Sequence, residues 1–234
     1  VIVAAHPDDE SLWFSSILSR VDKIILCMVD SQSRPQWGPA RREVMAQYPL
    51  PNLVSLDLVQ ADTLGHAADW KNPVLTKFGI ALSKKPHLKD HYQQNYSDLY
   101  QHLKRELSGY KNVFTHNPWG EYGHEEHIQV YRVVENLQKE LNFNIWYSNY
   151  CSNRSYQLMI EHRQRLSDAE TQGLPKPRAD DQIGYIIMQI CHRLMSRYNF
   201  QNYTWRDEME SAAVMDCVAS IDKFDPEKSK NPFA

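Results

Sequence analysis

The sequence predicts an α/β fold, in which a mostly parallel β-sheet carries helices on both faces. Short runs of branched apolar residues, typical of buried strands, alternate with segments whose apolar residues recur at helical spacing. Strands separated by helices require right-handed crossovers, which produce parallel pairing. With 234 residues, 42% of them hydrophobic, the chain can form one sizeable core, so we expect a single domain.

The element predictions follow from these two kinds of pattern. The first apolar run reads VIVAA and the second KIILCMV, and both are shorter than an ordinary helix. The predicted strands are Val1–Ala5, Lys23–Val29, Leu53–Leu58, Asn112–Thr115 and Asn144–Cys151. Residues 126–141 have the strongest helical pattern, and Pro39 fits the first turn of a helix. The predicted helices are Ser11–Arg20, Pro39–Gln47, Tyr96–Leu107 and Glu126–Leu141.

Two regions do not follow this alternation. Residues 60–94 show little periodicity and are too long for a plain connection, so they are expected to be functional or to carry minor structure of their own. The chain is therefore divided into a core that carries the motifs, 1–151, and a helical C-terminal extension or cap, 152–234. Within the extension, helices are predicted at 182–198 and 208–221.

Composition excludes several classes of function. Lys and Arg number 26 against 29 Asp and Glu, so the net charge of −3 favours neither nucleic acid nor an anionic membrane. No apolar run approaches the roughly 18–20 residues that span a bilayer. The four cysteines are widely spaced and form no CxxC, which suits a reducing compartment. We see no signal-peptide pattern and expect a cytoplasmic protein.

The densest chemical motif follows the first predicted strand. Residues 6–10 read HPDDE, and burying a histidine with several carboxylates is costly unless a metal, hydrogen bonds or chemistry offsets their desolvation. Ligands of open α/β sheets bind at the carboxyl ends of the strands. The second polar cluster, residues 116–127 (HNPWGEYGHEEH), follows the fourth predicted strand, so both clusters are expected at one edge of the sheet.

Together the two clusters predict a metal site. His6, Asp9 and one of His124 and His127 form a set of two histidines and one carboxylate. Three protein ligands that leave one position for water are typical of catalytic zinc, and such a set also suits Fe²⁺. The HEEH spacing is one residue short of the HExxH pattern of zincin metalloproteases, which excludes that class. Asp8, adjacent to Asp9, cannot share its geometry and is free to act as a base.

These motifs resemble those of a known family. Residues 5–10 (AHPDDE) are similar to the signature of the PIG-L/LmbE-like zinc-dependent de-N-acetylases. Residues 122–127 (YGHEEH) resemble the second motif of that family, usually Gly-His-x-Asp-His, with Glu126 where the family more often has Asp. Residues 41–43 (RRE) resemble an Arg…Glu stretch that the family tends to carry. The resemblance covers roughly residues 1–150.

The resemblance implies a Rossmann-like three-layer sandwich and hydrolysis of an N-acetyl group from an amino sugar or glycoconjugate. The implied zinc ligands are His6, Asp9 and His127. Asp8 would be the general base, His124 the acid or oxyanion donor, and Tyr122 a further oxyanion donor. Two alternatives stay open: a zinc amidohydrolase of a non-sugar acyl amide conjugate, and a carbohydrate-binding relative without catalysis.

The remaining candidates each have a structural alternative. One of Arg41 and Arg42 is expected to reach substrate, unless both lie on a solvated helix face. Asp30 contacts a sugar hydroxyl or caps a turn, and Trp119 stacks on a sugar ring or packs in the core. Three further residues are given mainly structural interpretations. Glu10 is interpreted as an acid in the first turn of a helix. Glu126 is interpreted either as such a first-turn acid or as a partner of His124, and His116 as a core or rim histidine.

Overall fold

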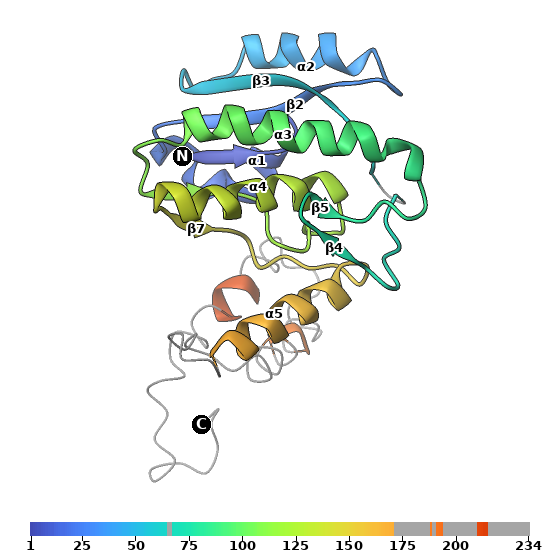
Figure 1. Ribbon diagram of the computed structural model, residues 1–234. Helices are drawn as coiled ribbons and strands as arrows, with labels where there is room; N and C mark the ends of the chain where they lie inside the picture. The colour runs from blue at the N-terminus through green and yellow to red at the C-terminus, as the bar shows by residue number, and fades with distance from the viewer. Residues whose placement is uncertain (65–66, 171–187, 189–190, 194–209, 215–234) are drawn as a thin grey trace, which may run out of the picture. The chain divides into compact units, whose positions relative to one another are not determined.

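The computed structural model describes residues 1–64, 67–170, 188, 191–193 and 210–214 (Figure 1). By its internal contacts the chain divides into two units, Val1–Gln164 and Arg165–Ala234. The first unit contains both motif clusters and extends past the expected core boundary at 151. The helices predicted at 182–198 and 208–221 lie mostly outside the described residues.

The first unit is built on a five-stranded sheet in which every strand pair is parallel. This confirms the predicted α/β class. The strands occur in the spatial order β3-β2-β1-β6-β7. They are β1 (Ile2–Ala4), β2 (Ile24–Ser31), β3 (Leu53–Gln60), β6 (Asn112–Phe114) and β7 (Asn144–Trp146). Each lies where a strand was predicted, but β7 ends before the predicted limit at Cys151.

The strand order creates a topological switch point between β1 and β6. From β1 the chain proceeds to β2 and β3 on one side of the sheet, and then crosses back to β6 and β7 on the other side. In open α/β sheets a crevice for ligands forms where the direction of winding reverses, beyond the carboxyl ends of the two central strands. The residues that follow Ala4 and Phe114 therefore face the same crevice.

Helices cover both faces of the sheet and give three layers. α3 (Lys89–Glu106) and α4 (Glu125–Leu141) lie side by side on one face, as Figure 1 shows. α1 (Asp9–Phe14), a 3-10 helix (Ser15–Arg20) and α2 (Trp37–Ala46) contribute to the core on the opposite face. The single helix predicted at 11–20 is thus an α-helical turn and a half followed by 3-10 helix, and α3 begins before the predicted Tyr96.

The two faces of β1 belong to different cores, because successive side chains of a strand point in opposite directions. Val3 packs with Leu103 of α3 and Val134 of α4. Ile2 packs with Phe14 of α1 on the other side. A strand that is buried on both faces has no polar positions, which explains the unbroken apolar run at the start of the sequence.

The long region 60–94 has minor structure of its own. It contains a two-stranded antiparallel hairpin, β4 (Leu75–Thr76) and β5 (Gly79–Ile80), and a short 3-10 helix, Pro86–Leu88. Gly79 has φ of 129°, and a Cβ there would lie 2.4 Å from the Tyr92 hydroxyl, so the hairpin requires glycine at this position. The region packs in a separate apolar cluster with the start of α4.

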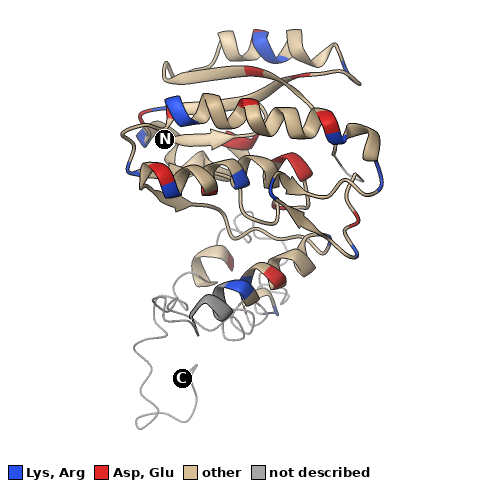
Figure 2. Ribbon diagram, in the orientation of Figure 1, with Lys and Arg blue, Asp and Glu red and all other residues tan. Residues whose placement is uncertain are grey.

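The surface of the described part carries no strong charge bias. Acidic and basic residues are interspersed over its helices, as Figure 2 shows.

α5 (Tyr156–Glu170) follows β7. No helix within the described ranges is long and apolar enough to cross a bilayer.

The buried packing of α3 leads to a first prediction. Replacing fully buried Leu103 by Ala removes a large side chain from the core that contains Val3 and is expected to lower the free energy of unfolding by about 2–5 kcal/mol. The matched control is Leu12→Ala, whose side chain is 63% exposed and whose loss should cost under about 0.5 kcal/mol. Chemical denaturation of both variants measures the difference, and equal midpoints would contradict this packing.

Candidate active site

The buried carboxylate of Asp9 lies at the centre of the crevice. It follows β1 in the first turn of α1, and the main-chain N–H of His6 donates to its Oδ2 at 2.9 Å. The same Oδ2 lies 3.2 Å from Nδ1 of His6 and 3.3 Å from Nε2 of His127. One oxygen from the first motif thus meets two imidazole nitrogens, one from each motif.

His127 presents a nitrogen lone pair to this point. Its Nδ1 lies 2.8 Å from Oε2 of Glu121, a buried carboxylate that can only accept, so Nδ1 carries the proton. Nε2 is then unprotonated in the neutral ring. It is buried and has no hydrogen-bond partner among the described residues. An unpaired buried nitrogen that faces a carboxylate oxygen is costly unless a cation lies between them.

His6 is held in the same way. Its Nε2 lies 2.9 Å from Oε2 of Glu126, and its Nδ1 lies 3.2 Å from Oδ2 of Asp9. In the tautomer that donates to Glu126, Nδ1 turns its lone pair toward Asp9. Both candidate ligands therefore hydrogen-bond a carboxylate through the nitrogen that is not directed at the centre. This arrangement is the usual support of metal-binding histidines, since it fixes the tautomer and the ring orientation.

The two separations at Asp9 Oδ2 fit a small cation. Ligands about 2.0–2.2 Å from a tetrahedral metal lie about 3.3–3.5 Å from one another, close to the two separations at Asp9 Oδ2. The electrostatics agree. Burial lowers the pKa of His127, but the charges of Asp9 and Glu121 outweigh it and raise the pKa to about 10. Positive charge is therefore stabilised at this point.

His124 lies against the cluster but its tautomer is different. The ring stacks on that of His127 with centroids 4.3 Å apart, and Nδ1 accepts the N–H of Glu126 at 3.2 Å as the N-cap of α4. A neutral imidazole that accepts at Nδ1 carries its proton on Nε2, so His124 is a donor and not a metal ligand in this arrangement. Burial, then the charges of His127 and His6, holds its pKa well below the usual range.

His116 is also excluded as a ligand, although it lies close to Asp9. Its Nε2 accepts the N–H of Ala5 at 2.8 Å, and its Nδ1 lies 3.1 Å from Oε2 of Glu121. Both nitrogens are thus occupied, as predicted for a satisfied core histidine. Candidate ligand atoms lie within 4.8 Å of one another in two triads, His6, His124 and His127, and Asp9, His116 and His127. Among the four histidines, the hydrogen bonds of the neutral rings favour His6 and His127 as candidate ligands.

Glu121 is a functional candidate that the sequence analysis missed. It is fully buried, has φ of 53°, and contacts both His116 and His127. Burial raises the pKa of this carboxyl, but the two imidazoles lower it to about 2, so it is charged. Its backbone is fixed by Asn117, whose Oδ1 accepts the Glu121 N–H at 2.8 Å. An acid six residues before a histidine, in a loop rather than a helix, has no periodic signal.

Asp8 lies at the rim, beside Asp9. Its φ of 142° is one that residues with side chains rarely adopt, and such strain concentrates at functional sites. The residue is exposed, while partial burial of its carboxyl and the charge of Asp9 raise its pKa. Glu10 instead faces inward, accepting the Asp8 N–H at 3.1 Å and the Tyr48 hydroxyl at 3.1 Å. This agrees with the structural interpretation of Glu10.

Tyr122 forms one wall of the crevice. Its ring centroid is 5.6 Å from that of His127 and 6.0 Å from that of His124. Burial and then the charge of Asp9 raise the pKa of its phenol, so the hydroxyl keeps its proton and can donate.

The two arginines have different surroundings. Arg42 donates to both oxygens of Asp30, at 2.9 and 2.5 Å, so these two predicted substrate contacts pair with each other at the surface. Arg41 is half-buried, donates to the carbonyl of Val29 and is attracted by the charge of Asp8. Of the two, only Arg41 feels the charges of Asp8 and Asp9.

Trp119 is placed differently from the expectation of sugar stacking. It is 2% exposed, and its Nε1 donates to the carbonyl of Tyr150 at 2.7 Å. The indole packs in the apolar cluster at the start of α4, beside Tyr147. Its structural interpretation fits this placement, and it is left out of the proposed substrate contacts.

The two acids between His124 and His127 join α4 to the region 60–94. Glu126 accepts the N–H of Ala61 at 2.5 Å through the oxygen that does not contact His6. Its carboxylate is thus a partner of His6, while its main-chain N–H is the partner of the His124 side chain. Glu125 is fully buried, and its Oε1 accepts three donors from the same region. These donors are the N–H groups of Ala67 and Ala68 and Nε1 of Trp70.

The fold and the crevice together define an α/β protein with a buried centre of two histidines and one carboxylate. No family model matches the chain, and no solved structure matches it significantly. It is 22% identical, over 161 residues and 61% of its length, to a 1D-myo-inositol 2-acetamido-2-deoxy-alpha-D-glucopyranoside deacetylase of Corynebacterium diphtheriae. The chain spans about half of that relative, 53% of its length.

The contacts of Glu125 lead to a second prediction. Glu125→Ala leaves three donors of the 60–94 region without their acceptor and is expected to lower the free energy of unfolding by about 2–3 kcal/mol. Glu125→Gln keeps an acceptor oxygen and should lose clearly less. Denaturation with a chelator present separates this effect from metal binding, and an equal loss in the two variants would argue against the hydrogen bonds as its cause.

Proposed function

We propose that this protein is a metal-dependent hydrolase that removes an N-acetyl group from an amino-sugar-containing small molecule, and that it is a PIG-L/LmbE-like de-N-acetylase. One observation carries the proposal. Asp9 Oδ2 converges with lone pairs of His6 and His127, and a glutamate fixes the opposite nitrogen of each ring. The name of the distant relative, a deacetylase of an acetylated amino sugar, supports the substrate class.

His6, Asp9 and His127 would hold zinc, or alternatively Fe²⁺, since both suit two histidines and a carboxylate. When bound, such a metal lowers the pKa of a water ligand from 15.7 to about 7 and polarises a carbonyl group. Every other function required for amide hydrolysis falls to side chains of this chain.

Asp8 is the proposed general base. It adjoins the ligand Asp9, is exposed at the rim and has a strained backbone that holds its carboxylate apart from that of Asp9. It takes one proton from the attacking water. The same carboxyl can return this proton to the amide nitrogen as the C–N bond breaks, which gives acetic acid and a neutral amine. The second water proton then passes from the acid to the amine, so acetate and a protonated amine leave.

His124 and Tyr122 are the proposed oxyanion donors. The capping bond to Nδ1 places the His124 proton on Nε2, which suits a neutral donor better than a protonated acid. This narrows the two roles that the resemblance implied for His124. Each such donor contributes about 2.7–4 kcal/mol to lowering the barrier where it has been measured in other enzymes.

The proposed reaction is tested by amine release. Purified protein with zinc or Fe²⁺ restored is assayed on a panel of N-acetylated glucosamine conjugates and on N-acyl amino acids. Turnover of the conjugates alone is expected. Turnover of the amino acids alone would favour the alternative of a non-sugar amidohydrolase. If no substrate reacts and gently purified protein contains no near-stoichiometric divalent metal, the non-catalytic carbohydrate-binding alternative is favoured.

A third prediction separates the base from the ligands. Asp8→Ala is expected to retain metal, measured by elemental analysis, and to lose activity by about 10²–10⁴-fold because general base catalysis is lost. His6→Ala is expected to lose both the bound metal and the activity. Asp22→Ala is the control, an exposed acid that precedes β2 at the opposite edge of the sheet. Hydrolysis by Asp8→Ala at the wild-type rate would show that the base is another group.

A further inference from the structure

Three aromatic rings extend outward from the proposed metal centre in a row. Tyr122 neighbours His127. Trp13 is next, with its ring centroid 6.3 Å from that of Tyr122, and Tyr150 is last, with its centroid 5.2 Å from that of Trp13. The rings come from three separate segments: α1, the loop before α4, and the segment that follows β7. None of the sequence motifs placed Trp13 or Tyr150 near the site.

The middle and outer residues of the row are held by hydrogen bonds. Nε1 of Trp13 donates to Oδ1 of Asp9 at 3.2 Å, through the oxygen opposite the one that faces the histidines. The indole position is therefore set by the candidate metal ligand. The main-chain carbonyl of Tyr150 accepts the Trp119 indole N–H at 2.7 Å and the Asn117 amide at 2.9 Å.

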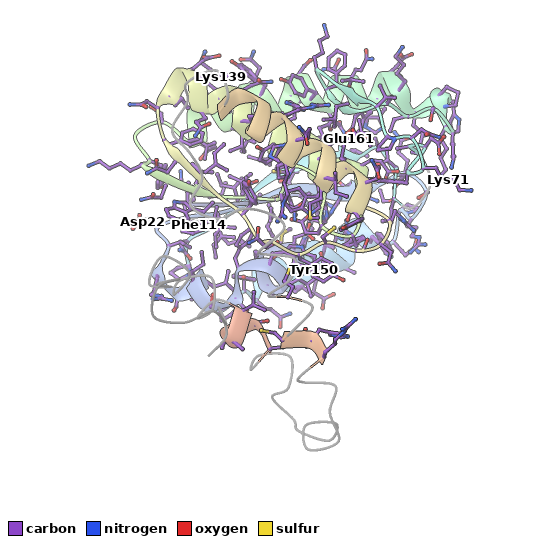
Figure 3. All side chains as sticks on the ribbon, turned by 90° about the horizontal axis from the view of Figure 1, so that it is seen from below. Asp22, Lys71, Phe114, Lys139, Tyr150 and Glu161 are labelled. Carbon is purple, nitrogen blue, oxygen red and sulfur yellow. The ribbon has the colours of Figure 1, made fainter. Side chains whose placement is uncertain are left out.

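The outer ring is open to solvent although its backbone is tied down. Tyr150, labelled in Figure 3, is 51% exposed. An exposed, anchored aromatic ring that continues a row from a polar centre is typical of small-molecule sites, where apolar walls hold the ligand and a few polar groups orient it. Such rings offer a large contact area at a low entropy cost because their positions are already fixed.

We propose that Trp13 and Tyr150 form a substrate subsite that takes two successive rings of a glycoconjugate. This rests on the proposed function. The ring that carries the acetamido group is bonded directly to the amide nitrogen, so it lies beside Tyr122 and Trp13 when the amide is at the centre. Tyr150 is one ring further out and contacts the cyclic group attached to the sugar, through the C–H bonds on its apolar face.

The subsite therefore selects conjugates over the simple sugar. Anionic or extended polar groups would gain nothing from the face of Tyr150, whereas a cyclohexane-like or second pyranose ring covers it. Trp13 has a separate function as a positioning residue, because its N–H orients the Asp9 carboxylate.

The test compares two substrates that differ only in the attached group, the methyl and the cyclohexyl glycosides of N-acetylglucosamine. Tyr150→Ala is expected to raise the ratio of KM for the cyclohexyl to the methyl glycoside about five-fold, with little change in the ratio of kcat values. Tyr150→Phe keeps the ring and should restore most of this selectivity. Tyr156→Ala, which removes another exposed tyrosine of α5 (42% exposed), is the matched control.

An unchanged KM ratio in Tyr150→Ala would overturn the subsite while leaving the proposed reaction intact. If the wild-type protein hydrolyses neither glycoside, the proposed function fails instead, and calorimetric titration of both glycosides decides the subsite. Tighter binding of the cyclohexyl glycoside that is lost in Tyr150→Ala supports it. Equal affinities in the two proteins, or no binding by either, overturn it.

Discussion

The arrangement around Asp9 depends on one electrostatic constraint: a buried carboxylate oxygen faces two imidazole lone pairs at about 3 Å. Three acceptors in contact repel one another, so the neutral cluster is stable only with added positive charge. Protonation of the rings supplies it, as the raised pKa of His127 indicates, and a divalent cation supplies it without moving the rings. The same constraint that makes the apo cluster attract protons therefore makes it a candidate for metal.

The start of α4 connects this cluster to the surrounding structure. His124 caps the helix, His127 faces Asp9, and the intervening Glu125 and Glu126 bind the region 60–94. The four residues HEEH thus face four different partners within a single helical turn. A shift of the helix would disturb the histidine–carboxylate cluster and the contacts to the region 60–94 together.

Much of the fold can be predicted from the sequence because its strands and helices each have a local pattern of apolar residues. The apolar run of β1 and the helical spacing of α4 each identify an element, and the strand order brings both motifs to one edge. The residues that hydrogen-bond the candidate metal ligands cannot be predicted in this way. Glu121 has no periodic signal, and Trp13 occupies an ordinary apolar helix position while donating to Asp9. Trp119 lies within a motif but packs in the core. The direction of the side chain, and not the spacing in the sequence, determines which of these residues contacts the site and which packs in the core.

Four histidines cluster in this crevice, so residue type alone cannot say which of them binds a metal. The tautomers can, because a neutral imidazole has one proton and one lone pair. His116 and His124 each accept a main-chain N–H, while His6 and His127 each donate to a glutamate. His6 and His127 lie 3.2 and 3.3 Å from Asp9 Oδ2, whereas Nε2 of His116, 3.6 Å from that oxygen, already accepts the Ala5 N–H. The glutamates outside the centre, more than the histidines themselves, determine which nitrogen of His6 and of His127 faces Asp9.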